Sequence, residues 1–297
     1  MECALDIMEY KLPQLHNFEI QIDGLHKHEE LERINVNTTN LARKYGFGYS
    51  SDLTDISGYV YSYLDVEYIQ VANDLHLWLW TLDDLVDATP ELADETLNSC
   101  LRILNGYKMT GGNKYAQLLG EVLETLEILN IDKVIMDSIK DACKDYILKG
   151  IIVHNLLKEP PSTVSYDKIR FYDSACQVVF PLTLIDLKNV GINDIQYKEA
   201  CNLANTIICR VNDIYSYPKD VYRDKSFFNY VYLYMTQNKL SLKTSLEHII
   251  CEINECYRKM TSLLPQKDTR LCRLQLWCKG NLLWHSKSTR YNINYIS

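Results

Sequence analysis

Hydrophobic side chains recur every three to four positions along most of the chain, which is the period of an α-helix with one buried face. Proline and glycine fall mostly between the periodic stretches, and no Asn-Gly or Asp-Gly turn joins two alternating stretches. The pattern therefore predicts an all-α helical bundle, a single domain over residues 1–297 in which residues 1–57 form an N-terminal segment packed on the bundle. The predicted helices cover residues 58–87, 91–106, 113–129, 131–157, 165–188, 193–217, 221–238, 240–264 and 268–290.

Two prolines interrupt this pattern. Pro181 lies inside the stretch 165–188, and Pro218 directly follows the stretch 193–217. Proline has no backbone N–H and therefore removes one helical hydrogen bond. We expect a kink or a break at each position.

Composition narrows the classes of partner. The 297-residue chain is 47% hydrophobic and carries a net charge of −8, which argues against nucleic acid, because phosphate backbones are bound by basic surfaces. An anionic small substrate remains compatible when metal ions mediate the contact. No apolar run has the length of a membrane span, and the first residues lack the basic region of a signal peptide. We expect a cytoplasmic protein whose ten scattered cysteines are free thiols. The sequence is compatible with a homodimer.

The first candidate motif is an aspartate cluster at the end of a strongly apolar stretch, Asp83-Asp84-Leu85-Val86-Asp87. Asp83 and Asp87 are four positions apart and share one face of a helix, with Asp84 beside them. Mg²⁺ takes oxygen ligands and commonly bridges a few carboxylates to a substrate phosphate. The cluster is therefore a candidate metal site, and a solvated acidic helix end is the alternative.

The second candidate motif is Asn212-Asp213-Ile214-Tyr215-Ser216-Tyr217-Pro218-Lys219-Asp220. Asn212, Ser216 and Asp220 recur every four positions, so a helix places them in one oxygen-bearing stripe. An amide, a hydroxyl and a carboxylate together suit a second Mg²⁺ site. A polar stripe facing solvent is the alternative, which the apolar flanking sequence disfavours.

Together the two motifs, on a helical chain, resemble those of the class I terpene synthases of the compact, single-domain microbial type, over residues 59–291. The resemblance implies a helical bundle with an active-site cavity open at one end. It implies three Mg²⁺ ions, with Mn²⁺ as a substitute, held by the residues of both motifs. Asp220 departs from the commoner glutamate and is one methylene shorter.

Further positions match the family in order along the chain. The resemblance makes Arg170 the catalytic diphosphate sensor, with Asp173 and Ser174 in the linker and effector positions that follow it. It places Lys219 and the pair Arg290-Tyr291, together with Arg170, on the substrate diphosphate. The candidate cavity aromatics, whose faces could stabilise a carbocation, are Trp80, Phe171, Phe180, Tyr215 and Trp284.

The function implied is Mg²⁺-dependent ionisation of a prenyl diphosphate, followed by release of diphosphate and cyclisation of the carbocation, a carbon–oxygen lyase reaction. The small residues Ser174, Ala175 and Cys176 leave room near the reacting carbon, which favours geranylgeranyl diphosphate slightly over farnesyl diphosphate. One alternative is a chain-elongating prenyl diphosphate synthase, although such an enzyme would normally carry a second aspartate-rich motif. The other is a non-catalytic helical binding protein.

Overall fold

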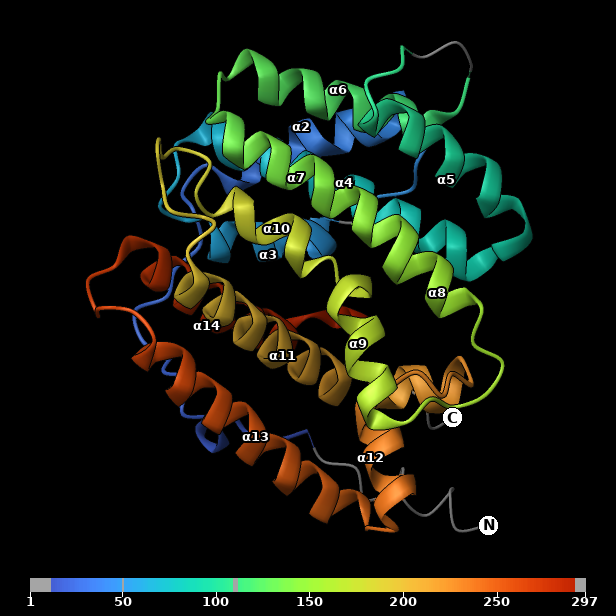
Figure 1. The fold of residues 1–297 in the computed structure, drawn as a ribbon, viewed down its shortest axis with the longest axis vertical. Helices are drawn as coiled ribbons and strands as arrows, with labels where there is room; N and C mark the ends of the chain where they lie inside the picture. Colours follow the sequence, from blue (N-terminus) through green and yellow to red (C-terminus); the bar gives the residue numbers. More distant parts are fainter. Residues whose placement is uncertain (1–11, 50, 109–111, 292–297) are drawn as a thin grey trace. The chain divides into compact units, whose positions relative to one another are not determined.

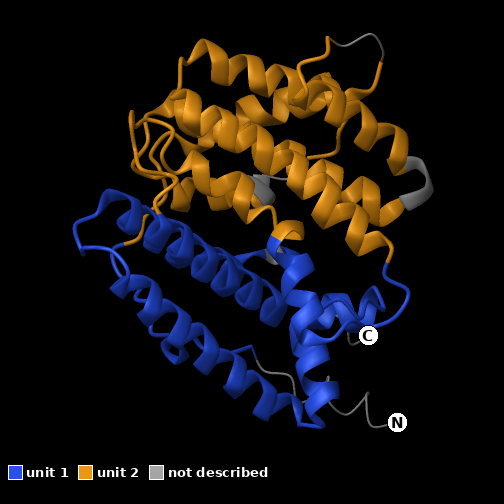
Figure 2. Cartoon of the chain, in the orientation of Figure 1, with its two compact units in different colours: residues 1–24, 157–171, 195–297 blue, residues 25–156, 172–194 orange. Residues whose placement is uncertain are grey.

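A computed structural model of the chain describes residues 12–49, 51–108 and 112–291. Helices predominate within these ranges, which contain no β-strand, so the predicted all-α fold is confirmed. The chain forms two compact units (Figure 2). Unit 1 comprises residues 1–24, 157–171 and 195–297, and unit 2 comprises residues 25–156 and 172–194.

Unit 2 is built around α4 (Val66–Ala88), which packs against α2 (Leu31–Lys44), α3 (Ser51–Val60), α5 (Pro90–Leu104) and α6 (Lys114–Ile128) (Figure 1). Leu75, Leu77 and Trp78 of α4 are almost completely buried, as expected for a helix surrounded by other helices. The remaining elements are α7 (Lys133–Asp145), the π-helical turn η2 (Tyr146–Ile151), α8 (Ile152–Asn155) and α10 (Cys176–Leu182), which packs on α7.

Unit 1 is built around α11 (Ile195–Tyr217), which packs against α12 (Tyr230–Asn238), α13 (Leu242–Ser262) and α14 (Thr269–Lys287). The π-helical turn η3 (Pro218–Arg223) continues α11 directly. The other elements are the short 3-10 helices η1 (Leu15–Asn17) and η4 (Thr289–Tyr291) and the helix α9 (Thr163–Asp173), whose residues up to Phe171 belong to this unit.

Several predicted helix bounds are wrong. The stretch 58–87 divides into the end of α3 and α4, because the chain turns at residues 61–65, where Leu64 N–H bonds the Tyr61 carbonyl. Tyr61 and Leu64 are buried, so the hydrophobic period runs through the turn and hides it. The predicted N-terminal segment contains the helix α2 and most of α3, and the stretch 131–157 contains the π-helical turn η2.

The stretch 165–188 breaks upstream of Pro181, contrary to the expectation that this proline interrupts it. Ala175 has a left-handed backbone (φ 58°) between α9 and α10, and the Ser174 hydroxyl accepts a hydrogen bond from Cys176 N–H (3.2 Å). Pro181 lies inside α10, whose last residue is Leu182. A hydrogen bond from Tyr61 Oη to the Val179 carbonyl (3.1 Å) holds this short helix.

α12 begins later than predicted, at Tyr230, because the Asn229 side chain caps it by accepting from Val231 N–H (3.0 Å) and Tyr232 N–H (3.4 Å). The cysteines in the described ranges are all free thiols, as predicted. Within those ranges no helix is both long enough and apolar enough to traverse a bilayer.

Candidate active site

The second motif lies where α11 passes into η3. Asn212 and Ser216 occupy the last turns of α11, and Asp220 lies in η3. The Ser216 hydroxyl donates to Asp220 Oδ2 (2.5 Å), and Asn229 Nδ2 donates to the same oxygen (3.0 Å). The wider π-helical turn after Pro218 therefore keeps Asp220 beside Ser216, and the proline does not turn the carboxylate away.

Arg170 reaches this motif from the last turn of α9. Its Nη2 donates to Asn212 Oδ1 (2.8 Å) and lies 3.7 Å from an oxygen of Asp213. Asp213 is buried and accepts hydrogen bonds from the Tyr166 hydroxyl and from Tyr230 N–H (3.0 Å). Burial raises the pKa of Asp213 to about 6, while Arg170 and Tyr166 oppose this rise by stabilising the carboxylate.

The C-terminal residues of unit 1 complete this network. Asn212 Nδ2 lies 3.1 Å from both the Tyr291 hydroxyl and His285 Nε2. The pKa of Tyr291 is raised to about 12, mainly by burial; the positive charges of Arg290 and Arg170 oppose this rise, and the negative charge of Asp220 adds to it. The electrostatic coupling of Tyr291 to Arg290, Asp220 and Arg170 indicates that the predicted diphosphate-binding residues lie around the second motif.

Lys219 also lies at this motif. Its Nζ is 3.7 Å from an oxygen of Asp220 and 3.4 Å from an oxygen of Asp224. Its side chain is only 18% exposed, so this charge lies partly within the protein surface and not on a freely solvated arm.

The donor chemistry of the second motif fits a hard divalent cation. It offers an amide oxygen, a hydroxyl and a carboxylate, which are the ligand types that Mg²⁺ prefers in proteins. Among the residues that the structure describes, no three Asp, Glu, His or Cys side chains converge on one point. A cation at this motif would therefore depend on the Asn212 amide and the Ser216 hydroxyl as well as on Asp220.

The first motif occupies the last turns of α4 in unit 2. Asp83 is half-buried, whereas Asp84 and Asp87 are exposed. Trp80, in the preceding turn, is half-buried. The pKa of Tyr115 on α6 is raised by burial first and then by the negative charge of Asp84. The aspartates thus lie at the rim of this unit's core, and their role as metal ligands stays a prediction.

Asp173 and Ser174 lie at the break between α9 and α10. Asp173 Oδ1 is 3.3 Å from His154 Nδ1, and the Asp173 side chain is 7% exposed. The Ser174 hydroxyl is engaged in the turn, where it accepts from Cys176 N–H. These contacts give both residues a structural role at the junction that directly follows Arg170.

The candidate cavity aromatics differ in burial. Phe180, Tyr215 and Trp284 are each no more than 3% exposed, whereas Phe171 is half-buried and its carbonyl accepts from Asn205 Nδ2 (2.9 Å). Trp284 packs edge-on against the rings of His285 and Tyr291. The Tyr215 ring lies 5.8 Å from that of His285 between centroids. Two of the five, Tyr215 and Trp284, therefore lie beside the network of Asn212, and the cavity role itself stays a prediction.

Sequence reasoning did not identify several residues of this network: Tyr166, Asp213, Asn229, Asn281 and His285. Asp213 stands inside the second motif and could have been noticed there. His285 and Tyr166 carry no local signal, because their partners come from other helices.

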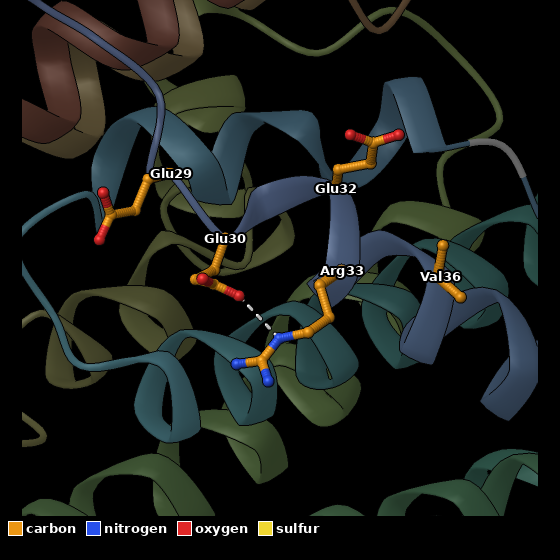
Figure 3. A pocket seen from close by; sticks show the side chains of 5 residues that line it. All are labelled: Glu29, Glu30, Glu32, Arg33 and Val36. Carbon is orange, nitrogen blue, oxygen red and sulfur yellow. Dashed lines mark ion pairs between the residues drawn. The ribbon is translucent and has the colours of Figure 1, made fainter.

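A surface hollow of about 360 Å³ lies at the start of α2, and no predicted site residue is among those that line it (Figure 3). Its lining consists of Glu29, Glu30, Glu32, Arg33 and Val36. Glu30 and Arg33 form an ion pair across it (2.8 Å). The excess of carboxylates suits neither a diphosphate nor a hydrocarbon chain, so the hollow is not a candidate active site.

Comparisons with known proteins agree with the fold and the motifs. The family described as "Terpene synthase family 2, C-terminal metal binding" matches residues 74–259, which include both aspartate-containing motifs and Arg170. The helical fold and this match define a class I terpene synthase, and the chain belongs to terpene synthase family 2. It is therefore an enzyme of the terpene synthase type.

Individual relatives are distant. The chain is 23% identical to "Sesquiterpene synthase 6" of Postia placenta over 81% of this chain and 76% of that protein. It is 24% identical to "Terpene synthase 4" of Physarum polycephalum over 73% of this chain and 72% of that protein. The linalool/nerolidol synthase of Streptomyces clavuligerus shares the fold, with a TM-score of 0.80 and 14% identity over 90% of this chain and all of that structure.

Proposed function

We propose that the chain is a magnesium-dependent terpene synthase that ionises a prenyl diphosphate, releases diphosphate and cyclises the resulting carbocation. The observation that carries this proposal is the network around Asn212. One amide joins the sensor Arg170 and the C-terminal Tyr291 on the helix that also bears Ser216. Family membership supports the reaction class, and this network supports the assignment of residues to it.

Asn212, Ser216 and Asp220 would hold Mg²⁺ through their oxygens, and Asp83, Asp84 and Asp87 are proposed as further ligands on α4. Bound Mg²⁺ would neutralise the charge that develops on the leaving diphosphate. Arg170, Lys219 and Arg290 would donate hydrogen bonds to diphosphate oxygens, and Tyr291 would add its hydroxyl. Asp173 and Ser174 keep the proposed linker and effector roles because they follow Arg170 where α9 ends.

The carbocation would be protected by apolar surroundings and stabilised by aromatic faces. Phe180, Tyr215 and Trp284 are the strongest of the proposed cavity residues, because their rings are buried. Trp80 and Phe171 are half-buried and would act at the edge of the proposed cavity.

We propose farnesyl diphosphate as the first substrate and geranylgeranyl diphosphate as the second, which reverses the order expected from the sequence. That order depended on Ser174, Ala175 and Cys176 as small cavity residues. In the structure Ser174 and Ala175 form the turn between two helices, and Cys176 is buried at the start of α10. The Postia placenta relative is named a sesquiterpene synthase, which also favours a C15 chain.

The test is to incubate the purified chain with the C10, C15 and C20 diphosphates and Mg²⁺ and to analyse extracts by gas chromatography–mass spectrometry. We expect a hydrocarbon or alcohol product that disappears with EDTA and returns with Mg²⁺. Asn212→Ala should lose at least about a hundredfold in kcat, the scale of one lost transition-state contact. Asn202→Ala, at an exposed position of α11, is the matched control and should keep full turnover.

Competition between the C15 and C20 diphosphates, measured as the ratio of kcat/KM, tests the substrate order. A parallel incubation with added isopentenyl diphosphate tests the elongating alternative, and elongated diphosphates as its only products would make the chain a prenyl chain-elongating enzyme. The absence of any product with all three substrates, from a folded chain loaded with Mg²⁺, would contradict the proposal altogether.

A further inference from the structure

His285 is a buried histidine of α14 whose two ring nitrogens both have defined partners. The residue is 4% exposed. Nδ1 lies 2.9 Å from the Asn281 carbonyl oxygen, and Nε2 lies 3.1 Å from the Asn212 side-chain nitrogen. The ring stacks on Tyr291, with 5.2 Å between centroids and 15° between planes. No sequence motif marks this residue, and the proposed reaction does not use it.

The partners of His285 determine where its proton lies. A carbonyl oxygen can only accept, so Nδ1 must carry the hydrogen that faces Asn281. Arg170 Nη2 donates to the Asn212 oxygen, so the amide nitrogen is the atom that faces Nε2, and a donor at that position requires an Nε2 without a hydrogen. Nε2 of a neutral ring protonated at Nδ1 is an acceptor.

These contacts together give the orientation of the Asn212 amide. The atom that faces an acceptor nitrogen must be the NH₂ group, which has two hydrogens. One points to His285 Nε2 and the other to the Tyr291 hydroxyl, each at 3.1 Å. The amide oxygen is left to face Arg170 Nη2 at 2.8 Å, and a flipped amide would place two donors against each other there.

We propose that His285 is a positioning residue that locks the Asn212 amide so that its oxygen, and not its nitrogen, is presented to the metal. This inference rests on the proposed function, since it concerns the same metal motif. A flipped Asn212 would offer NH₂ to the cation, which cannot ligate it. Partners that orient a ligand in this way typically change metal affinity tenfold to a hundredfold when they are removed.

The test compares His285→Phe with His285→Gln. Phenylalanine keeps the stacked ring and removes the acceptor, whereas glutamine can return an acceptor oxygen near the position of Nε2. The readout is Mn²⁺ affinity in the presence of inorganic diphosphate, measured from the free-Mn²⁺ signal in electron paramagnetic resonance. His248→Phe, at an exposed position of α13 whose ring contacts Tyr234, is the matched control.

We expect His285→Phe to weaken Mn²⁺ binding about tenfold to a hundredfold, His285→Gln to recover most of the loss, and His248→Phe to match the parent. Circular dichroism identifies a variant that fails to fold. In that case Tyr291→Phe, which removes the partner of the other amide hydrogen, should weaken binding in the same direction. The inference is overturned if His285→Phe binds Mn²⁺ as tightly as the parent, or if His285→Gln loses as much affinity as His285→Phe. If the parent still makes terpenes in that case, the proposed function stands without the inference. A folded parent that binds no Mn²⁺ with diphosphate overturns the proposed function as well.

Discussion

Arg170 donates its hydrogen bond to the oxygen of Asn212 that the proposed cation would also use. The distance is 2.8 Å, and the neighbouring carboxylate of Asp213 lies 3.7 Å from the same guanidinium nitrogen. A guanidinium and a divalent cation repel each other at one oxygen. Metal loading would therefore loosen Arg170 from Asn212 and make its charge available to diphosphate.

We predict that Arg170→Lys keeps KM close to the parent value and lowers kcat about tenfold to a thousandfold, because lysine lacks the planar fork that can hold two phosphate oxygens. Single-turnover kinetics measure the ionisation step directly. Arg258→Lys, on an arginine of α13 whose side chain is 65% exposed, is the control and should leave both constants unchanged. An unaltered ionisation rate in Arg170→Lys would remove this residue from the site.

Residues of the candidate site can be predicted from the sequence when oxygen-bearing side chains recur at a fixed spacing. Asn212, Ser216 and Asp220 were predicted because four-residue spacing on a helix is a local property. The hydrogen bonds from Asn212 to His285 and Tyr291 join positions far apart in the chain. His285 is brought to Asn212 by the packing of α14 on α11, and Tyr291 lies in η4, which follows α14; no local pattern contains either contact.

At the level of elements, η2 makes an unusually close contact with the end of α9. A Cβ placed on Gly150 would lie 2.8 Å from both Asp173 Cα and Asp173 N, and 3.0 Å from the Tyr172 carbonyl carbon. These are backbone atoms, which cannot rotate away. The absence of a side chain at Gly150 thus allows the π-helical turn to support the junction that follows Arg170.

We predict that Gly150→Ala lowers the free energy of unfolding by about 1–3 kcal/mol, because the added methyl group overpacks this contact. Gly120→Ala is the matched control. Gly120 lies inside α6 and a Cβ there meets no atom within 4 Å, so alanine should stabilise the chain by about 0.5–1 kcal/mol. Urea unfolding followed by circular dichroism measures both. Equal effects of the two substitutions would show that the close contact at Gly150 carries no strain.

The hydrophobic period predicted where helices exist better than where they end. The junction at Ala175 is the clearest example, since a left-handed alanine has no signature in sequence and Pro181 drew attention to the wrong position. α12 begins where the Asn229 side chain caps it. An asparagine before an apolar stretch is common, so it does not by itself mark the start of a helix. Helix bounds depend on such single side-chain contacts, whereas helix existence depends on a pattern repeated over many residues.

For the whole molecule, the all-α fold and the terpene synthase class were both predictable. The fold follows from the period, and the class follows from two motifs in order on a helical chain. The division into two compact units was not predictable, because no change in composition marks the crossings of the chain near residues 25, 157, 172 and 195. Each unit also buries ionisable groups, which make stability depend on pH.

Buried carboxyls and buried histidines affect stability in opposite directions. Burial raises the pKa of Asp74 and of Asp213 to about 6, so their contributions to stability are lost as pH rises through 6. Burial lowers the pKa of His76 to about 4 and of His285 to about 3, so their contributions are complete above pH 6.5 and are lost as pH falls through these values. The two effects partly cancel between pH 4 and 6, and a single substitution is needed to separate them.

Asp74, in unit 2, offers that separation. Its Oδ1 accepts from the Thr38 hydroxyl (2.6 Å) and Gln70 Nε2 (3.0 Å), and an asparagine oxygen can accept the same two bonds. Burial is the main cause of its raised pKa, and the charge of Glu121 adds to it. The folded chain therefore binds this proton up to about pH 6, whereas the unfolded chain releases it near the ordinary value of 3.8.

We predict that Asp74→Asn, which cannot ionise, gains about 1–3 kcal/mol of unfolding free energy relative to the parent between pH 4 and pH 7. Asp213, His76 and His285 remain in both chains, so their contributions cancel in this difference. Urea unfolding at each pH measures it, and Asp94→Asn, at an exposed position of α5, should show no such trend. A difference between Asp74→Asn and the parent that stays constant from pH 4 to pH 7 would mean that Asp74 keeps an ordinary pKa in the folded chain.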